Sequence, residues 1–119
     1  MKIVNLTQHE ATREQIEAGV FEPVEKELVK KLLTFTDLPI IDEIGDRAER
    51  LADIALENGA DAAMIGGAPY LIASLHDALV GRDIQPLYAF SKRVSVEKEE
   101  GGKIIKTSVF KHVGFVGLE

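Results

Sequence analysis

The sequence of 119 residues contains no cysteine and no tryptophan, and only 6% of its residues are aromatic. The absence of cysteine excludes disulfides, thiolate metal ligands and cysteine nucleophiles, and it is typical of proteins from a reducing compartment. No run approaches the roughly 18 apolar residues of a membrane span, and the first ten residues lack the apolar core of a secretory signal. We therefore expect a cytoplasmic protein that does not associate with membranes.

Positive charge is scarce in most of the chain. The formal net charge is −6, and residues 1–89 hold 8 Lys and Arg against 16 Asp and Glu. Residues 90–119 reverse this balance, with 6 basic against 4 acidic residues. The overall acidity argues against binding to long nucleic acids, so any local positive field must come from the C-terminal quarter. A solvated hairpin whose lysines protect its edge would have the same pattern.

Several familiar catalytic and cofactor motifs are also missing. The sequence has no H-E-x-x-H, no histidines at i and i+4, and no carboxylates at metal-ligand spacing, so we expect no metal and no cofactor. It contains no G-x-x-x-x-G-K-[ST] loop, no G-x-G-x-x-G fingerprint and no G-x-S-x-G elbow. The common phosphate loops and serine triads are therefore not expected here.

Strand and helix patterns alternate along what we expect to be one domain, residues 1–119. Thr12 and Gln15 form a capping-box pattern, and Gly19 suits the end of the short helix that they begin. The longest helical pattern, residues 40–58, has acidic residues at its start and Gly59 at its end. The expected strands are 2–6, a brief one before residue 23, 61–65 and 84–90, and the expected helices are about 13–18, 24–35, 40–58 and 69–81.

This order predicts an α/β fold with a mostly parallel sheet and helices on both of its faces. The last part, about residues 93–119, alternates around Gly101-Gly102 and predicts an antiparallel β-hairpin. In open sheets of this kind, ligands bind beyond the carboxyl ends of the strands, where the strand order reverses. If strands 2–6 and 61–65 are neighbours there, the loops after them line one crevice. Those loops contribute Thr7, Gln8, His9, Gly66, Gly67 and Ala68.

The stretch "GGAP" (66–69) joins a strand pattern to a helix pattern. Free amides at a helix start bind anions, and glycine lets a phosphate approach closely. Pro69 suits the first helical turn, which needs no amide donor. A plain strand-to-helix turn would have the same sequence, so from this stretch alone the two interpretations have equal weight.

Other candidate residues follow two of the expected strands. His9 could bind phosphate, act as an acid or base, or cap a backbone group. Ser91, Lys92 and Arg93 follow the strand at 84–90, where their cations suit phosphate contacts, although a charged strand exit is the simpler alternative. The returning strand adds Thr107 and Lys111 on one face.

Three stretches together resemble a family of small, stand-alone CRISPR-associated proteins, the CARF-related ring nucleases of type III antiviral defence. They are "TQHEATREQIEAGV", "MIGGAPYL" and "PLYAFSKRVSVEKEEGGKIIKTSVFKHVGF". The resemblance implies a Rossmann-like homodimer that binds a cyclic oligoadenylate, usually cyclic tetra-adenylate, across its two-fold axis. It also implies metal-independent cleavage to a linear product with a 2′,3′-cyclic phosphate.

On this interpretation Ser91, Lys92, Arg93 and His9 are the catalytic candidates. The remaining candidates bind the ligand: Thr7, Gln8, Gly66, Gly67, Ala68, Pro69, Thr107 and Lys111. Two alternatives stay open. The same crevice could sense a nucleotide without cleaving it, or the chain could be an α/β domain of unrelated function.

Overall fold

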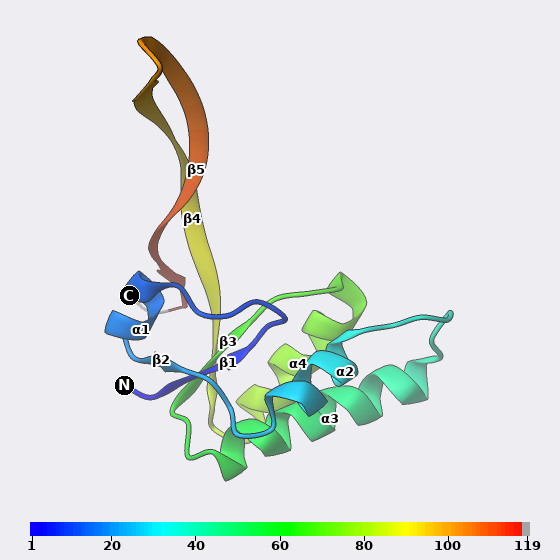
Figure 1. Ribbon diagram of the computed structural model, residues 1–119. Coiled ribbons are helices and arrows are strands. Elements are labelled where there is room, and N and C mark those ends of the chain that lie inside the picture. Colours follow the sequence, from blue (N-terminus) through cyan, green and yellow to red (C-terminus); the bar gives the residue numbers. More distant parts are fainter. Residues whose placement is uncertain (118–119) are drawn as a thin grey trace.

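The protein consists of an α/β body and a long β-arm, residues 91–111, as Figure 1 shows for the computed structural model. The structure describes residues 1–117. The elements in chain order are β1 (Ile3–Leu6), α1 (Arg13–Glu17), β2 (Val20–Phe21), α2 (Lys26–Leu33), α3 (Ile41–Glu57), β3 (Ala62–Ile65), α4 (Pro69–Val80), β4 (Gln85–Glu100) and β5 (Lys103–Val116). Every strand and helix expected from the sequence has a counterpart in this order.

The five strands form a sheet with the order β2-β1-β3-β4-β5. β1 pairs in parallel with β2 and with β3, and β3 pairs in parallel with β4. Only β5 is antiparallel to its neighbour. The predicted α/β class, the mostly parallel sheet and the antiparallel C-terminal hairpin are thus confirmed. The direction of strand addition reverses between β1 and β3, which are neighbours as the sequence led us to expect.

The two faces of the sheet are covered unequally. On one face, Val4, Leu6, Ala63 and Ile65 pack with the buried side chains of α2, α3 and α4. On the other face, a small cluster around Met64 is covered partly by residues of the α1 region and of β5. The expected cover of helices on both faces is therefore uneven, because a five-residue α1 is too short to span a sheet face.

Local sequence signals explain several element ends. The predicted capping box is present, since the Thr12 hydroxyl accepts from the Gln15 amide and the Gln15 side chain accepts from the Thr12 amide. α3 begins without a side-chain cap, and Asp42 and Glu43 place negative charge in its first turn instead.

Within residues 1–117, no helix combines the length and the apolar character that a membrane crossing requires.

The C-terminal hairpin differs from the expected one in its length and origin. We expected a strand at 84–90 and a separate hairpin from about 93, whereas β4 runs without interruption from Gln85 to Glu100. A bulge between Phe90 and Ser91 marks the point where β4 leaves the body. The predicted turn at Gly101-Gly102 is confirmed, with positive φ at both residues as a tight hairpin turn requires. β5 continues through the "HVGFV" stretch, and residues 118–119 of the expected hairpin lie outside the described residues.

Candidate functional site

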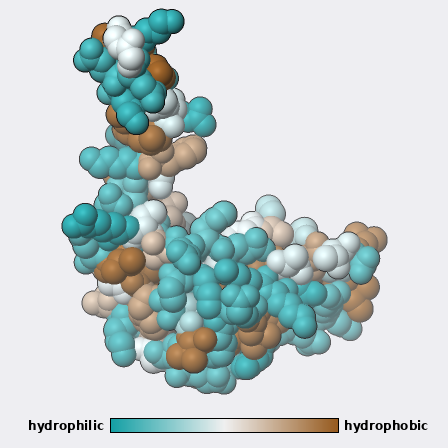
Figure 2. Space-filling view, viewed as in Figure 1, coloured by the Kyte–Doolittle hydropathy of each residue, from teal (hydrophilic) through white to brown (hydrophobic). Residues whose placement is uncertain are grey.

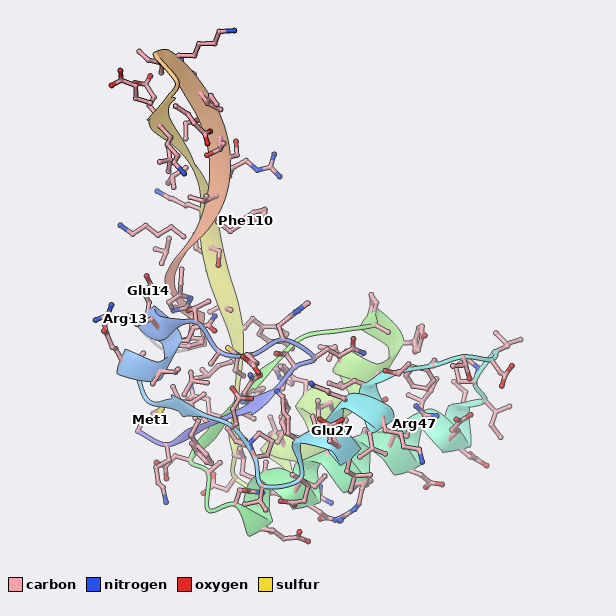
Figure 3. All side chains as sticks on the ribbon, viewed as in Figure 1. Met1, Arg13, Glu14, Glu27, Arg47 and Phe110 are labelled. Atoms are coloured by element: carbon pink, nitrogen blue, oxygen red, sulfur yellow. The ribbon has the colours of Figure 1, made fainter. Side chains whose placement is uncertain are left out.

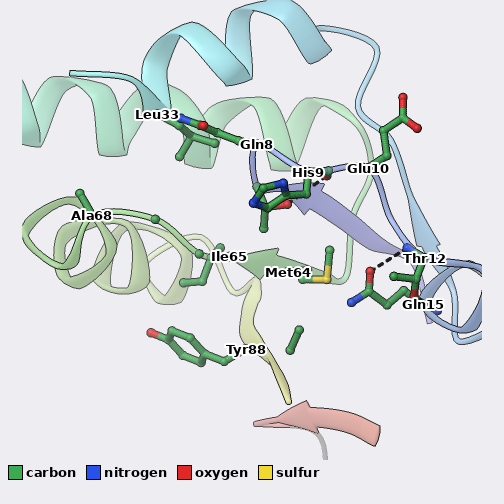
Figure 4. A pocket seen from close by; sticks show the side chains of 14 residues that line it. Gln8, His9, Glu10, Thr12, Gln15, Leu33, Met64, Ile65, Ala68 and Tyr88 are labelled. Carbon is green, nitrogen blue, oxygen red and sulfur yellow. Dashed lines mark hydrogen bonds between the residues drawn. The ribbon is translucent and has the colours of Figure 1, made fainter. Parts of the chain in front are cut away.

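A cleft of about 600 Å³ lies at the carboxyl ends of β1 and β3, beside the part of β4 that holds Tyr88 and Ala89. It occupies the position that the strand reversal predicts, and its volume is typical of small-ligand sites. Figure 4 shows this cleft from close by. Its lining residues are Thr7, Gln8, His9, Glu10, Thr12, Gln15, Leu33, Met64, Ile65, Gly66, Gly67, Ala68, Tyr88 and Ala89.

The turn between β3 and α4 forms one wall of the cleft. Gly67 has a φ of +149°, in the region that favours glycine, whereas Gly66 does not. α4 then begins with Pro69 as its first helical residue. Among residues 1–117, the amides of Gly67 and Ala68 donate no hydrogen bond to another backbone group. This wall therefore combines free amide donors with the positive end of a twelve-residue helix, the combination that suits an anion.

The loop after β1 forms the opposite wall. Thr7 is half-buried, whereas Gln8 and His9 are exposed. The imidazole of His9 projects into the cleft in Figure 4. The side-chain nitrogen Nε2 of Gln8 donates to the Thr34 hydroxyl at 3.0 Å, which ties the loop to the end of α2. The two loops that sequence reasoning expected at one crevice do line the same cleft.

Buried Asn5 of β1 holds this loop in place. Its side-chain oxygen accepts from the amide of Thr7 at 3.0 Å and from the Thr7 hydroxyl at 2.7 Å. Its side-chain nitrogen donates to the carbonyl of His9 at 2.7 Å and to the Glu22 carboxylate at 3.0–3.1 Å. The side chain is fully buried. All its hydrogen-bonding capacity is used to fix the loop, which offsets the cost of burying an amide.

Glu22 and Lys26 complete this network. Lys26 contacts the Glu22 carboxylate at 2.7 Å and donates to the carbonyl of Thr7 at 3.0 Å. Burial by itself raises the pKa of Glu22, but the hydrogen bonds from Lys26, Asn5 and the amide of Ala11 outweigh it and hold the pKa below the ordinary value. Glu22 therefore stays ionised at neutral pH, and Lys26 is used to pin the loop.

Tyr88 of β4 lines the cleft beside the end of β3. Its hydroxyl lies 2.9 Å from Nδ1 of His76 on α4, and the two rings are stacked with centroids 6.0 Å apart. Burial, assisted by the negative charge of Asp77, raises the pKa of Tyr88. The phenol is thus neutral throughout the physiological range, held in position by a helix residue behind the cleft.

The remaining predicted site residues do not line the cleft. Pro69 starts α4, just beyond the lining residue Ala68. Ser91, Lys92 and Arg93 are exposed residues of β4 that follow the lining residue Ala89, on the far side of the bulge. Thr107 and Lys111 are exposed on β5. Figure 3 shows the neighbouring Phe110 on the part of the arm nearer the body.

The cleft lining carries one carboxylate, Glu10, and neither Lys nor Arg. The nearest predicted cation in the sequence is Lys92, three residues after Ala89. The side chain of Arg93 lies over the Phe110 ring, 5.1 Å from its centroid. Within residues 1–117 there is no group of three or more His, Asp or Glu side chains that could hold a metal ion.

A family model described as the uncharacterized protein MJ1673 family matches residues 1–116. The chain belongs to this family. Searches of curated proteins and of solved structures returned no significant match. The match spans the body and the whole arm, so the MJ1673 family model includes the arm as well as the cleft.

Sequence reasoning missed several contributors to this site, among them Asn5, Glu22, Lys26 and Tyr88. A signal existed for Asn5, because an amide in the otherwise apolar strand "IVNL" must find partners when it is buried. The Glu22–Lys26 pair had the i, i+4 spacing of an ion pair. Tyr88 carried no comparable signal, because its role depends on contacts with a helix that the strand pattern does not reveal.

The Asn5–Glu22 contact can be tested by a destabilising substitution and a second substitution that rescues it. Asn5→Asp replaces a donor with a carboxylate about 3 Å from that of Glu22, and such like charges repel. We expect this variant to lose about 2–4 kcal/mol of unfolding free energy at pH 7. The added variant Glu22→Gln restores a donor–acceptor pair and recovers much of the loss in urea unfolding. An Asn5→Asp protein as stable as wild type would contradict the network.

The depressed pKa of Glu22 predicts an acid-dependent loss of stability. Because the folded pKa lies below the ordinary value of 4.5, the carboxylate stabilises the fold above that pH. The contribution is lost as the pH falls through the folded pKa. At pH 7, Glu22→Gln should cost about 1 kcal/mol, since the side chain is partly exposed.

Urea unfolding from pH 7 to pH 3 measures this effect. The difference in unfolding free energy between wild type and Glu22→Gln should become smaller toward pH 3. Glu17→Gln is the matched control, because both side chains of its ion pair with Arg13 are largely exposed, and it should change the unfolding free energy little. A constant gap at every pH would rule out the assigned role of Glu22.

Proposed function

We propose that this protein is a metal-independent ring nuclease that binds and cleaves a cyclic oligoadenylate, with cyclic tetra-adenylate as the preferred ring. It would act in type III CRISPR defence in the cytoplasm, as a homodimer of Rossmann-like domains. One observation carries the proposal: the loops that hold Thr7–His9 and Gly66–Ala68 face each other across the cleft at the strand reversal. The resemblance of the sequence to that family supplies the choice of ligand.

Phosphate is the ligand group that the cleft suits best. The amides of Gly67 and Ala68 lie at the start of α4, where the helix dipole favours negative charge. Thr7 and Gln8 offer hydroxyl and amide groups for a ribose or a base. Apolar Leu33 and Ile65 line the same cleft and suit the face of an adenine ring.

The reaction that we propose needs positioning and proton transfer. A ribose 2′-oxygen attacks the adjacent phosphorus, the bond from phosphorus to the 5′-oxygen breaks, and a 2′,3′-cyclic phosphate forms. One proton leaves the 2′-hydroxyl and one is taken up by the departing 5′-oxygen. His9 is the histidine among the residues that line the cleft, and imidazole is the side chain that most often serves as a general acid or base. The free amides would stabilise the charge that develops on the phosphate oxygens.

A four-nucleotide ring is larger than one cleft, so the ligand would extend beyond it. The arm begins at Ser91, two residues after Ala89, and its first residues Ser91, Lys92 and Arg93 are exposed. We propose that these residues, with Thr107 and Lys111 of β5, supply the positive charge that the cleft lining lacks. Two clefts related by a two-fold axis would match a ring with its own two-fold symmetry.

A non-catalytic nucleotide sensor is the second candidate function. The specific observation in its favour is that the cleft lining contains no Lys or Arg. A site with less charge stabilisation could bind a phosphate ligand and leave it intact. Binding without turnover would select this candidate.

A cleavage assay tests the proposed reaction. Purified protein is incubated with cyclic tetra-adenylate in EDTA, and the products are separated by chromatography. Wild type should give linear products, and His9→Gln should slow cleavage by about 10²–10⁴-fold. His112→Gln on β5, outside the cleft lining, should cleave normally. An intact ring at high wild-type concentration, or an unimpaired His9→Gln variant, would exclude the catalytic proposal.

Alanine substitutions at Gly66 and Gly67, in the cleft wall between β3 and α4, should have different effects. A Cβ on Gly66 would meet Thr7 Cγ2 at 3.7 Å, an ordinary contact. Gly66→Ala should therefore fold normally, within about 0.5 kcal/mol of wild type, but weaken ring binding by about tenfold. Gly67→Ala should lose about 1–3 kcal/mol of stability because of its positive φ. Urea unfolding and calorimetry separate the effects, and normal binding by Gly66→Ala would exclude the wall as the phosphate contact.

A further inference from the structure

The arm, which we define as residues 91–111, projects from one end of the body (Figure 1). The molecule measures 57 × 35 × 24 Å. Its radius of gyration is 16.6 Å, whereas a compact domain of this length has about 13.5 Å. A two-stranded ribbon alone in water is marginally stable. The arm therefore needs a partner surface.

The two faces of the arm differ in chemistry. Cross-strand partners share a face, and the register pairs Val94 with Val109, Val96 with Thr107 and Lys98 with Ile105. We call this side the valine face. Its apolar centre is bordered by Lys92, Lys98, Lys103 and Lys111, with Glu100 as its only acid.

The opposite side of the arm is mostly hydroxyl and mixed charge. It carries Ser95 opposite Ser108 and Glu97 opposite Lys106. Its Phe110 packs with Arg93 of the same face. This side also exposes Ile104 at 68% and Phe110 at 71%, but its charges balance. The valine face therefore differs from it in carrying a net positive charge, which an acidic surface can match.

A surface of matching chemistry lies at the other end of the body, where α2 leads into α3 (Figure 1). We define residues 37–43 as the acidic tip. It exposes Leu38, Ile40 and Ile41 at 96%, 66% and 82%. Its three charged residues, Asp37, Asp42 and Glu43, are all acidic. Hydrophobic residues are visible at this end of the molecule in Figure 2.

The acidic tip is held in place by Arg47. The guanidinium contacts the Glu43 carboxylate at 2.8 Å and donates to the carbonyl of Thr34 at 2.7 Å. It also lies over the Phe35 ring, 4.2 Å from the centroid. The tip thus exposes a run of large apolar side chains on a fixed scaffold, which is typical of a surface that binds another protein.

We propose that the valine face of each arm docks on the acidic tip of a second copy of this chain. Apolar centres meet in this arrangement, and the lysines of one copy meet the carboxylates of the other. Because the arm and the tip lie at opposite ends of the body, a two-fold axis lets both contacts form at once. Packing of one valine face on another would instead bring two rings of lysine together.

The proposed interface rests on the proposed function, because it describes how the two chains of that homodimer would pack. Formation of the interface does not require a nucleotide. Sizing of the free protein therefore tests it independently of ring cleavage. If the ring is not cut and the interface variants behave as described below, the docking stands and the nuclease fails. If the ring is cut by a monomer, the reverse holds.

Two adjacent residues provide a matched pair of variants. Ile105 lies on the valine face and Ile104 on the opposite face of the same strand. In light scattering after size exclusion without nucleotide, wild type should have twice the 13.0 kDa chain mass. Ile105→Lys should fall to a single chain mass, while Ile104→Lys stays dimeric. A monomeric wild type, or equal behaviour of the two variants, would overturn the proposal.

A charge exchange tests the acidic tip as the partner. Lys98→Glu/Lys103→Glu changes only the arm, and Asp37→Lys/Asp42→Lys changes only the tip. Each double variant alone should be monomeric, because its own arm and tip then repel. An equimolar mixture should form a heterodimer, since both of its arm–tip contacts pair opposite charges. A tip variant that stays dimeric by itself, or a mixture that stays monomeric, would rule out this partner.

Discussion

The buried amide of Asn5 is the contact on which the shape of the cleft depends. It sits in a four-residue strand that is buried throughout, so its polar atoms must find partners within the protein. Those partners are the loop that carries Thr7 and His9, and the Glu22 carboxylate that Lys26 also holds. One side chain thereby couples the end of β1, the segment after β2 and the start of α2 into a single wall.

Much of the body could be predicted because its signals are local. The capping-box pattern of Thr12 and Gln15 predicts the start of α1 from four residues. The apolar runs of β1 and β3 predict buried strands. Neighbouring parallel strands place their carboxyl ends together, so topology was enough to bring His9 and Gly67 to one cleft. The identity of the ligand remains a proposal, because periodicity and strand order carry no information about it.

The parts that could not be predicted depend on contacts between distant residues. Asn5 and Glu22 meet only because β1 and β2 pair, and Tyr88 meets His76 only after α4 has packed on the sheet. The strand pattern of the β4 sequence continues through Ser91 and Arg93 without a break. The sequence therefore did not predict where the body ends and the arm begins. The bulge that marks this point is a property of the pairing with β5.

The continuity of β4 has a mechanical consequence. The backbone that presents Tyr88 and Ala89 to the cleft continues directly into the arm, with the bulge at Phe90 and Ser91 as the pivot. The first part of this strand therefore forms part of the cleft, and the longer remaining part extends into solvent. A contact that orients the arm therefore acts on the same strand that presents Tyr88 to the cleft.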